Sequence, residues 1–196
     1  VYPACPGYLS DSCVRCGWQH IEYAAQLLLK QDVLADQLER VGKLRPASLR
    51  AALEPAIPAP VQWGYLHHVT WLVDDLGGQR RLGLPAREGR RPVADRDCAL
   101  IHPDLLALRD ALDLDLENIW RVRLMRSSGG ALMIILSIQQ EEAPELALDL
   151  PASVNLLLPD NEPMNLIGDP AAHYTVGDHS LRVTTGGYVH AHAAML

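Results

Sequence analysis

The chain reads Trp120-Arg121-Val122-Arg123-Leu124 near its middle, so that apolar and basic residues alternate. A period of two residues is typical of a strand that buries one face. The segment Ser127-Ser128-Gly129-Gly130 follows, and glycine pairs favour tight turns. A second strand pattern, more apolar than the first, covers 131–140. These residues therefore predict an antiparallel β-hairpin.

Shorter patterns on both sides of this hairpin predict the rest of the fold. Expected strands cover 67–73, 80–84, 92–94, 154–158, 165–167, 173–176 and 181–184. Expected helices cover 21–41, 48–53 and 103–112. Successive strands joined by tight turns predict an α+β fold, with a mainly antiparallel sheet and a few helices on one side.

Composition limits the classes of protein to which the chain can belong. Its 196 residues are 48% hydrophobic, which is typical of a globular protein. No apolar run approaches the ~20 residues that a membrane-spanning helix needs. The formal net charge of −7 argues against the chain binding a polyanion by itself. Arginines nevertheless gather just before Cys98, at positions 80, 81, 87, 90, 91 and 96. They predict either a solvated loop that offsets the charge of a metal cluster or a contact with nucleic acid.

The cysteines of the chain are unevenly spaced. Cys5, Cys13 and Cys16 lie close together near the N-terminus, and Cys98 stands far from them. An iron–sulfur cluster tolerates such irregular spacing. Structural zinc usually takes two CxxC-type pairs, and only one is present here. Two disulfides would need an oxidising compartment, and nothing in the chain looks like a secretory signal. The spacing alone leaves iron–sulfur, zinc, disulfide and unliganded cysteines open.

The residues around the cysteines resemble a known family. The series Cys5…Cys13-x-x-Cys16-x-Trp18-Gln19-His20-Ile21-x-Tyr23-x-x-Gln26 is similar to the iron–sulfur signature of the RNA uracil-5-methyltransferases. The series Asp97-Cys98-x-Leu100-x-His102-Pro103 resembles the fourth-cysteine motif of the same family. The segments 121–138 and 181–188 resemble its central hairpin and the beginning of its methyltransferase domain. The resemblance extends over nearly the whole chain.

The resemblance implies a ligand set, a cofactor and a reaction. Cys5, Cys13, Cys16 and Cys98 would hold a [4Fe–4S] cluster, and S-adenosylmethionine would bind in a Rossmann-like domain absent from this chain. Members of the family methylate C5 of uridine in rRNA or tRNA, using a cysteine nucleophile on an extruded base. No cysteine follows Cys98, so we expect the chain alone to be inactive. A cytoplasmic enzyme without a membrane span is also implied.

The resemblance divides the chain into five parts. They are a cluster-binding loop (1–20), an amphipathic helix (21–45), a linker (46–60), a central antiparallel α/β domain (61–185) and the start of the methyltransferase domain (186–196). In relatives the helix packs on the methyltransferase domain, so its apolar stripe has no partner within this chain. We therefore expect self-association through residues 21–41.

Expected contacts with RNA and cofactor follow from the same resemblance. The candidates for RNA contact are Arg87, Arg90, Arg91 and Arg96, although the net charge leads us to expect weak or no RNA binding by the chain alone. His190 stands where the family has a glutamine close to the uracil and the methyl donor, which makes it a candidate cofactor-binding residue.

Histidines occupy several family-motif positions. His67 and His68 stand in place of an asparagine and a lysine that help to hold RNA, and His190 and His192 replace a glutamine and an asparagine. These departures keep a second interpretation open. In that interpretation the chain is a non-catalytic iron–sulfur module, from a diverged relative, that binds RNA or a protein.

Overall fold

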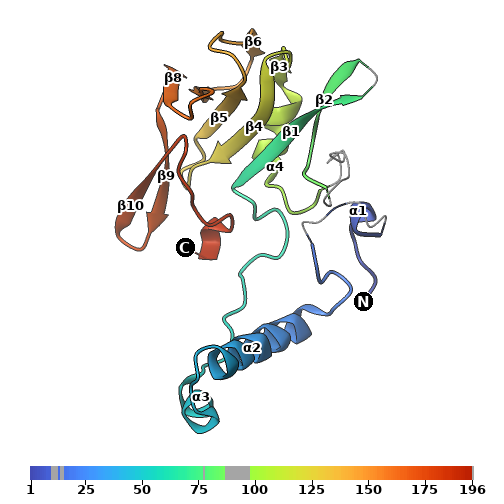
Figure 1. The fold of residues 1–196 in the computed structure, drawn as a ribbon, viewed down its shortest axis with the longest axis vertical. Coiled ribbons are helices and arrows are strands. Elements are labelled where there is room, and N and C mark those ends of the chain that lie inside the picture. The colour runs from blue at the N-terminus through green and yellow to red at the C-terminus, as the bar shows by residue number, and fades with distance from the viewer. Residues whose placement is uncertain (10–12, 14–15, 77, 87–97, 196) are drawn as a thin grey trace.

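The computed structural model describes residues 1–9, 13, 16–76, 78–86 and 98–195 of the chain. Its main feature is a six-stranded sheet with the strand order β2-β1-β4-β5-β7-β8 (Figure 1). The strands are β1 (His68–Leu76), β2 (Gln79–Gly83), β4 (Ile119–Arg126), β5 (Leu132–Ile138), β7 (Ala152–Leu157) and β8 (Pro163–Ile167). The expected strand at 92–94 lies outside the described residues.

The central hairpin forms where the alternating residues predict it. Strand β4 pairs antiparallel with β5, with Arg126 opposite Leu132. The turn closes with a hydrogen bond from the Gly130 N–H to the Ser127 carbonyl, 2.9 Å long. Gly130 has a φ of +91°, a conformation that residues with a Cβ rarely adopt. The glycine is therefore a requirement of the turn.

The sheet is antiparallel except at one pair, which confirms the α+β, mainly antiparallel class. Strand β7 runs parallel to β5, with Ile134 opposite Val154. The chain between them includes β6 (Leu146–Leu148), which pairs with β3 (Leu112–Leu114) in a small separate sheet. These two strands were not predicted, because three residues are too few to establish a period of two.

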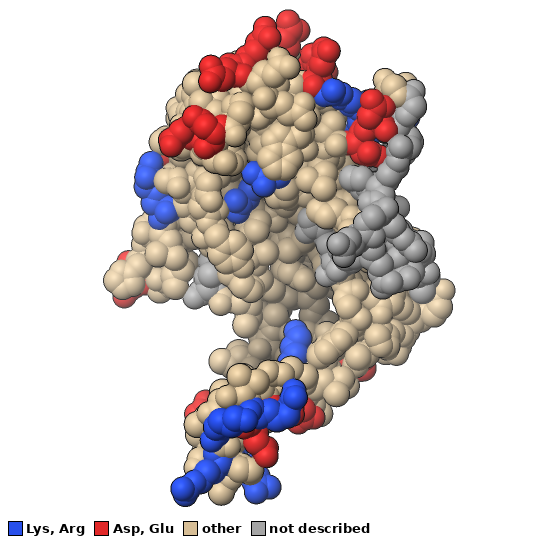
Figure 2. Space-filling view, in the orientation of Figure 1, with Lys and Arg blue, Asp and Glu red and all other residues tan. Residues whose placement is uncertain are grey.

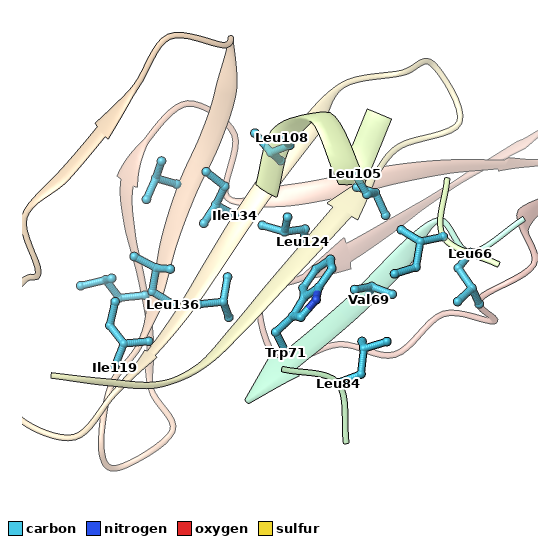
Figure 3. Packing of buried hydrophobic residues seen from close by; sticks show 14 of the residues in the cluster. Leu66, Val69, Trp71, Leu84, Leu105, Leu108, Ile119, Leu124, Ile134 and Leu136 are labelled. Atoms are coloured by element: carbon cyan, nitrogen blue, oxygen red, sulfur yellow. The ribbon is translucent and has the colours of Figure 1, made fainter. Parts of the chain in front are cut away.

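Both faces of the sheet centre are covered. On one face Leu124, Ile134 and Leu136 pack with Leu105 and Leu108 of helix α4 (Pro103–Asp110), as Figure 3 shows. Burying an aliphatic side chain of this size contributes about 1.5–3 kcal/mol. This double coverage explains why 131–138 is almost continuously apolar, since alternate side chains enter two different cores.

On the opposite face, Met125, Met133 and Ile135 pack with Tyr174 and Val183 of a two-stranded ribbon. The ribbon consists of β9 (Ala171–Val176) and β10 (His179–Thr184). Of the three helices expected, the one at 103–112 is the one that covers a face of the sheet in the described residues, so the expected group of a few helices on one side is a single helix. The second face is covered by strands.

The N-terminal part of the chain is organised differently. Helices α2 (Tyr23–Arg40) and α3 (Pro46–Ala52) lie apart from the sheet (Figure 1). Helix α2 lies within the expected 21–41, whereas α3 begins two residues before the expected 48–53. Two short helices, α1 (Pro6–Leu9) and η1 (Ala193–Met195), complete the described elements. No residue of α2 is buried, so its apolar stripe does not fold back onto the sheet. None of the helices in the described ranges is long and apolar enough to cross a membrane.

Candidate metal centre

The N-terminal cysteines are held in a loop that closes on itself through polar contacts. The Cys5 N–H donates to Oε1 of Gln19 over 3.1 Å, and the Tyr8 hydroxyl donates to the Gly17 carbonyl over 3.2 Å. A Cβ built on Gly7 would lie 3.6 Å from the Cys5 sulfur and 3.7 Å from Cβ of Cys13. Cys5 and Cys13 thus both lie close to Gly7.

Cys98 is positioned by a second segment, which is fastened to the edge of the sheet domain. The Gly64 N–H donates to the Ala99 carbonyl (2.8 Å), and the Leu66 N–H donates to the Leu100 carbonyl (2.9 Å). Cys98 and Cys16 are both half-buried and both pack against the main core. Residues far apart in the sequence are therefore brought to one side of the sheet domain.

The pKa of Cys16 is influenced by the other three thiols. Burial raises the pKa of the Cys16 thiol, and Cys98, Cys13 and Cys5 raise it further, whereas the Gln19 side chain lowers it. All four cysteines are free thiols. Within the described ranges, no three His, Cys, Asp or Glu side chains lie close enough together to hold a metal ion. The four thiols form a loose group, not a closed ligand cage.

A cavity of about 560 Å³ adjoins this group. Its wall includes Cys16, Gln19 and Lys30. It also includes the ring pair Tyr65 and His192, which stack with their centroids 4.5 Å apart. The His192 Nε2 atom forms a hydrogen bond with the Val61 carbonyl, 3.0 Å away. The cavity is large enough for a small ligand, and several aromatic rings contribute to its wall.

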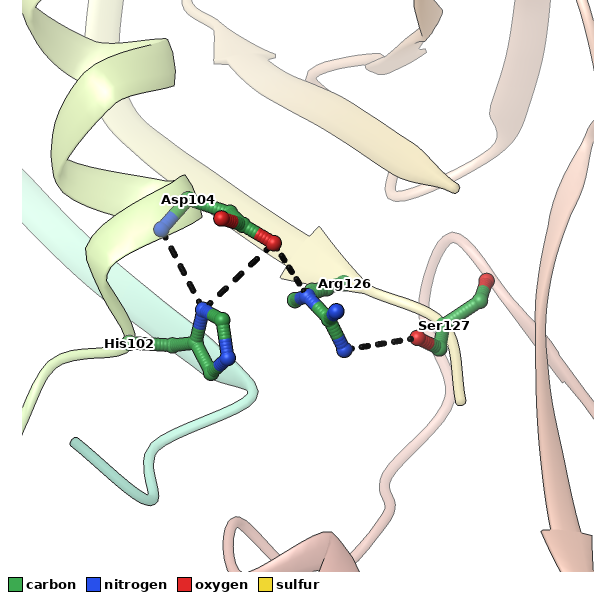
Figure 4. Close-up of polar contacts among 4 residues, drawn as sticks. All are labelled: His102, Asp104, Arg126 and Ser127. Carbon is green, nitrogen blue, oxygen red and sulfur yellow. Dashed lines mark hydrogen bonds and ion pairs between the residues drawn. The ribbon is translucent and has the colours of Figure 1, made fainter. Parts of the chain in front are cut away.

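Next to the Cys98 segment, a cluster of charged and titratable residues joins α4 to the end of β4 (Figure 4). His102 caps α4 by accepting a hydrogen bond from the Asp104 N–H at 3.2 Å, and Arg126 Nε donates to Asp104 Oδ2 at 2.6 Å. The Arg126 side chain also lies beside Ser127. The arginine is thus engaged within the protein.

Two histidines of this cluster have lowered pKa values. Burial lowers the pKa of His67, and the nearby His102 and Arg126 lower it further. Burial and Arg126 lower the pKa of His102, while Asp104 acts in the opposite direction. Both rings are therefore neutral near pH 7, and neither adds a positive charge to this part of the protein.

The structure brings together the four histidines at family-motif positions. The His67 N–H donates to the Ala191 carbonyl over 3.0 Å, and His68 Nε2 forms a 2.9 Å hydrogen bond with the Val189 carbonyl. The exposed His190 accepts a hydrogen bond from the His192 N–H at Nδ1, 3.3 Å away. Sequence alone shows no link between these two segments, because their contact depends on the fold.

The basic residues fall into two groups. Arg121 Nε donates to Ser137 Oγ (3.1 Å), and Arg123 Nη1 donates to the Gly187 carbonyl (2.9 Å), so both side chains support the fold. The expected RNA contacts Arg87, Arg90, Arg91 and Arg96 lie outside the described residues. On the face shown in Figure 2, acidic side chains gather near β3 and β6, and basic side chains gather over α2 and α3.

Comparison with known proteins identifies the relatives of the chain. No family model matches it. An uncharacterized RNA methyltransferase of Synechocystis sp. is 31% identical over 117 residues, which are 59% of this chain and 24% of that protein. The 23S rRNA (uracil(1939)-C(5))-methyltransferase RlmD of Dechloromonas aromatica is 34% identical over 110 residues, or 55% of this chain and 24% of the enzyme. RlmD of Pseudomonas aeruginosa is 28% identical over 202 residues, or 96% of this chain and 44% of the enzyme.

A solved structure shares the fold. It is the crystal structure of Pyrococcus abyssi tRNA (uracil-54, C5)-methyltransferase in complex with S-adenosyl-L-homocysteine, with a TM-score of 0.62 and 12% sequence identity. The match covers 93% of this chain and 48% of that chain. The chain thus spans less than half the length of these relatives. It is homologous to RNA methyltransferases, among them enzymes that methylate C5 of uracil.

Proposed function

We propose that the chain is the cluster-bearing central part of an S-adenosylmethionine-dependent RNA uracil-C5 methyltransferase that acts on rRNA or tRNA. One observation carries this proposal: the pairing of 64–66 with 99–102 brings Cys98 near Cys16, whose pKa is raised by all three other cysteines. The homology to RNA methyltransferases supplies the reaction class.

The donor set fits an iron–sulfur cluster. Cys5, Cys13, Cys16 and Cys98 are four free, half-buried thiols, and thiolates are the usual ligands of such clusters. We propose that these four hold a [4Fe–4S] cluster. Methyl transfer needs no electron, so the cluster would serve to fasten the N-terminal loop and the Cys98 segment to each other. Zinc also accepts four thiolates, so the metal must be determined directly.

Metal analysis tests the cluster. After anaerobic reconstitution we expect about four iron and four sulfide ions per chain, the content of one [4Fe–4S] cluster. Cys98→Ser should lower the iron content to near zero and leave the sheet folded, because its core does not depend on the cluster loop. Zinc without sulfide in the wild-type protein would contradict the proposed cluster and would indicate a structural zinc site instead.

The chain's own residues would supply scaffold and substrate contacts. No cysteine follows Cys98, so we propose that the nucleophile and the site for S-adenosylmethionine lie in another part of the enzyme. His190 would lie near the uracil and the methyl donor, in agreement with its exposed position beside the 66–68 segment. Arg87, Arg90, Arg91 and Arg96 remain the proposed RNA contacts, with weak or no binding by the chain alone.

An activity measurement separates the chain from the whole enzyme. Incubation with uridine-containing RNA and labelled methyl donor should give no 5-methyluridine with this chain and turnover with the full-length protein. Methylation by the chain alone would refute the assignment of catalysis to another part of the enzyme.

We also propose the domain division 1–20, 21–45, 46–60, 61–185 and 186–196, in which helix α2 serves as a contact surface. Leu28 and Val33 of α2 are 64% and 53% exposed. In the full enzyme this surface would contact the methyltransferase domain, and in the isolated chain it would contact a second copy. Measurement of the mass in solution tests the second statement.

A second function is favoured by the histidines at positions 67, 68, 190 and 192. The segments that carry them meet at one contact, where His68 takes the place of the lysine of the family pattern. A non-catalytic iron–sulfur module that binds RNA or a protein would tolerate this change. A full-length protein that holds a cluster but gives no methylated uridine would favour this function.

A further inference from the structure

The two polar atoms of the Gln19 side chain differ in their hydrogen bonding. Its Oε1 accepts a 3.1 Å hydrogen bond from the Cys5 N–H. Its Nε2 is buried, without any partner in hydrogen-bonding geometry. A buried donor left unpaired costs about 1–3 kcal/mol, and such atoms call for an explanation. The Oε1 atom of the amide is therefore held by a hydrogen bond, whereas the buried Nε2 can still donate one.

The backbone around Gln19 is held firmly, so the position of this donor is not accidental. The Ile21 N–H donates to the Trp18 carbonyl over 2.9 Å. Gln26 Nε2 donates to the Trp18 carbonyl (3.0 Å) and to the Ile21 carbonyl (2.9 Å). Gln26 thus fastens the residues on both sides of Gln19 through backbone atoms alone.

The neighbour of the spare donor is Cys16. Both residues contribute to the wall of the same cavity, three positions apart in the chain. The Gln19 side chain lies close enough to the Cys16 thiol to oppose part of the rise in its pKa that burial causes, although Nε2 and the sulfur are not in hydrogen-bonding geometry. We regard this contact as an incomplete N–H···S hydrogen bond, since a neutral thiol is a weak acceptor.

We propose that Gln19 is a positioning residue that donates a hydrogen bond from Nε2 to the Cys16 sulfur when this sulfur serves as a thiolate ligand. The inference rests on the proposed cluster. A thiolate accepts a stronger, charge-assisted hydrogen bond than a thiol does. Partners of this kind orient metal ligands, and hydrogen bonds to the sulfurs raise the reduction potential of a cluster.

A competing explanation is that Gln19 only holds the backbone at Cys5. Two substitutions separate these roles. Gln19→Leu removes both the acceptor and the donor, whereas Gln19→Glu keeps an oxygen for the Cys5 N–H and removes the donor. Gln26→Leu is the matched control, because it removes a glutamine from the same cavity wall whose hydrogen bonds go to backbone carbonyls.

The experiment measures iron, sulfide and the midpoint potential of the reconstituted cluster in the wild type and the three variants. We expect more negative potentials for Gln19→Leu and Gln19→Glu, with the larger shift for the added carboxylate, and a wild-type potential for Gln26→Leu. If both Gln19 variants lose the cluster while they and Gln26→Leu stay folded, the donor is again required, because it is the feature that both lack.

Two results would overturn the inference. One is a wild-type potential in both Gln19 variants. The other is a Gln19→Glu variant that assembles a cluster of wild-type potential when Gln19→Leu does not, which would assign Gln19 to the Cys5 backbone alone. A wild-type protein without iron and sulfide would instead refute the proposed cluster, so the two failures are distinguishable.

Discussion

The sheet and the first sixty residues differ in how many apolar side chains they bury. The sheet buries apolar side chains on both faces, and Trp71, Leu124 and Leu136 have no exposed surface. In the described part of 1–60, Leu49 is the one buried hydrophobic residue, and α2 has none. The sheet therefore carries its own stability, while the described part of the N-terminal region is held mainly by polar contacts, to which the proposed cluster and the proposed contact of α2 would add.

The largest expected effect comes from matched leucine substitutions in the two regions. Leu136 is fully buried, so Leu136→Ala should lower the free energy of unfolding by about 2–5 kcal/mol. Leu28 is 64% exposed, so Leu28→Ala should change it by no more than about 0.5 kcal/mol. Urea unfolding followed by tryptophan fluorescence measures both. Equal costs would show that α2 is packed as tightly as the sheet.

The proposed iron–sulfur cluster would stabilise one region and not the other. Metal binding to a site that is not rigid beforehand contributes directly to local folding. Reconstitution should slow amide hydrogen exchange at residues 1–9 and 16–22 by at least about tenfold and leave β4 and β5 unchanged. The comparison uses wild-type and Cys98→Ser proteins under the same conditions. Uniform protection of both regions would mean that the cluster is part of one cooperative unit.

The apolar surface of α2 predicts a smaller effect, on association and not on folding. Leu34 is 48% exposed, and Leu34→Glu places a charge within this surface. We expect the wild-type chain to self-associate and Leu34→Glu to be monomeric, with the same unfolding free energy. Gln37→Glu adds the same charge on the same helix and serves as the control. Light scattering after size-exclusion chromatography gives the mass. A monomeric wild type would contradict the prediction of self-association through 21–41.

Sequence patterns predicted the regular part of this architecture well. Alternation over 120–124 and the glycines at 129–130 were sufficient for the central hairpin, because period and turn chemistry are local properties. The parallel pairing of β5 with β7 was missed, since a continuously apolar strand does not indicate its neighbour's direction. The patterns at the cysteines suggested a shared site, but several ligands remained open until the resemblance was considered.

Other features of the site depend on contacts that local patterns do not encode. The meeting of 66–68 with 189–192 joins segments from opposite ends of the sheet domain. The unpaired Nε2 of Gln19 follows from the course of the loop around Cys5. Arg123 belongs to the alternating pattern of 120–124, and nothing in that pattern indicates that its side chain reaches the Gly187 carbonyl. In each case a residue's role is set by a partner far away in the sequence.

The smallest expected effect is a pH dependence of stability, which originates in the group of charged and titratable side chains that joins α4 to β4. The folded state lowers the pKa of His67 and His102, so the unfolded chain binds more protons at mildly acidic pH. Stability should therefore be complete above the usual histidine pKa of about 6.5 and should decrease as the pH falls through that value. For each histidine the loss is at most about 1.36 kcal/mol per pH unit, and it stops once the pH falls below the pKa of the folded state.

His102→Asn tests this origin, because asparagine is a good helix N-cap and does not titrate. Urea unfolding at pH 7.5 and 5.5 should show a smaller decrease in the variant than in the wild type. The groups facing these histidines are Asp104, Arg126 and His192. Asp104, whose pKa is lowered by its hydrogen bond with Arg126, stays ionised over this range and does not contribute. An unchanged pH dependence in the variant would assign the loss to other groups, and the sheet end beside the cysteines would then be insensitive to histidine protonation.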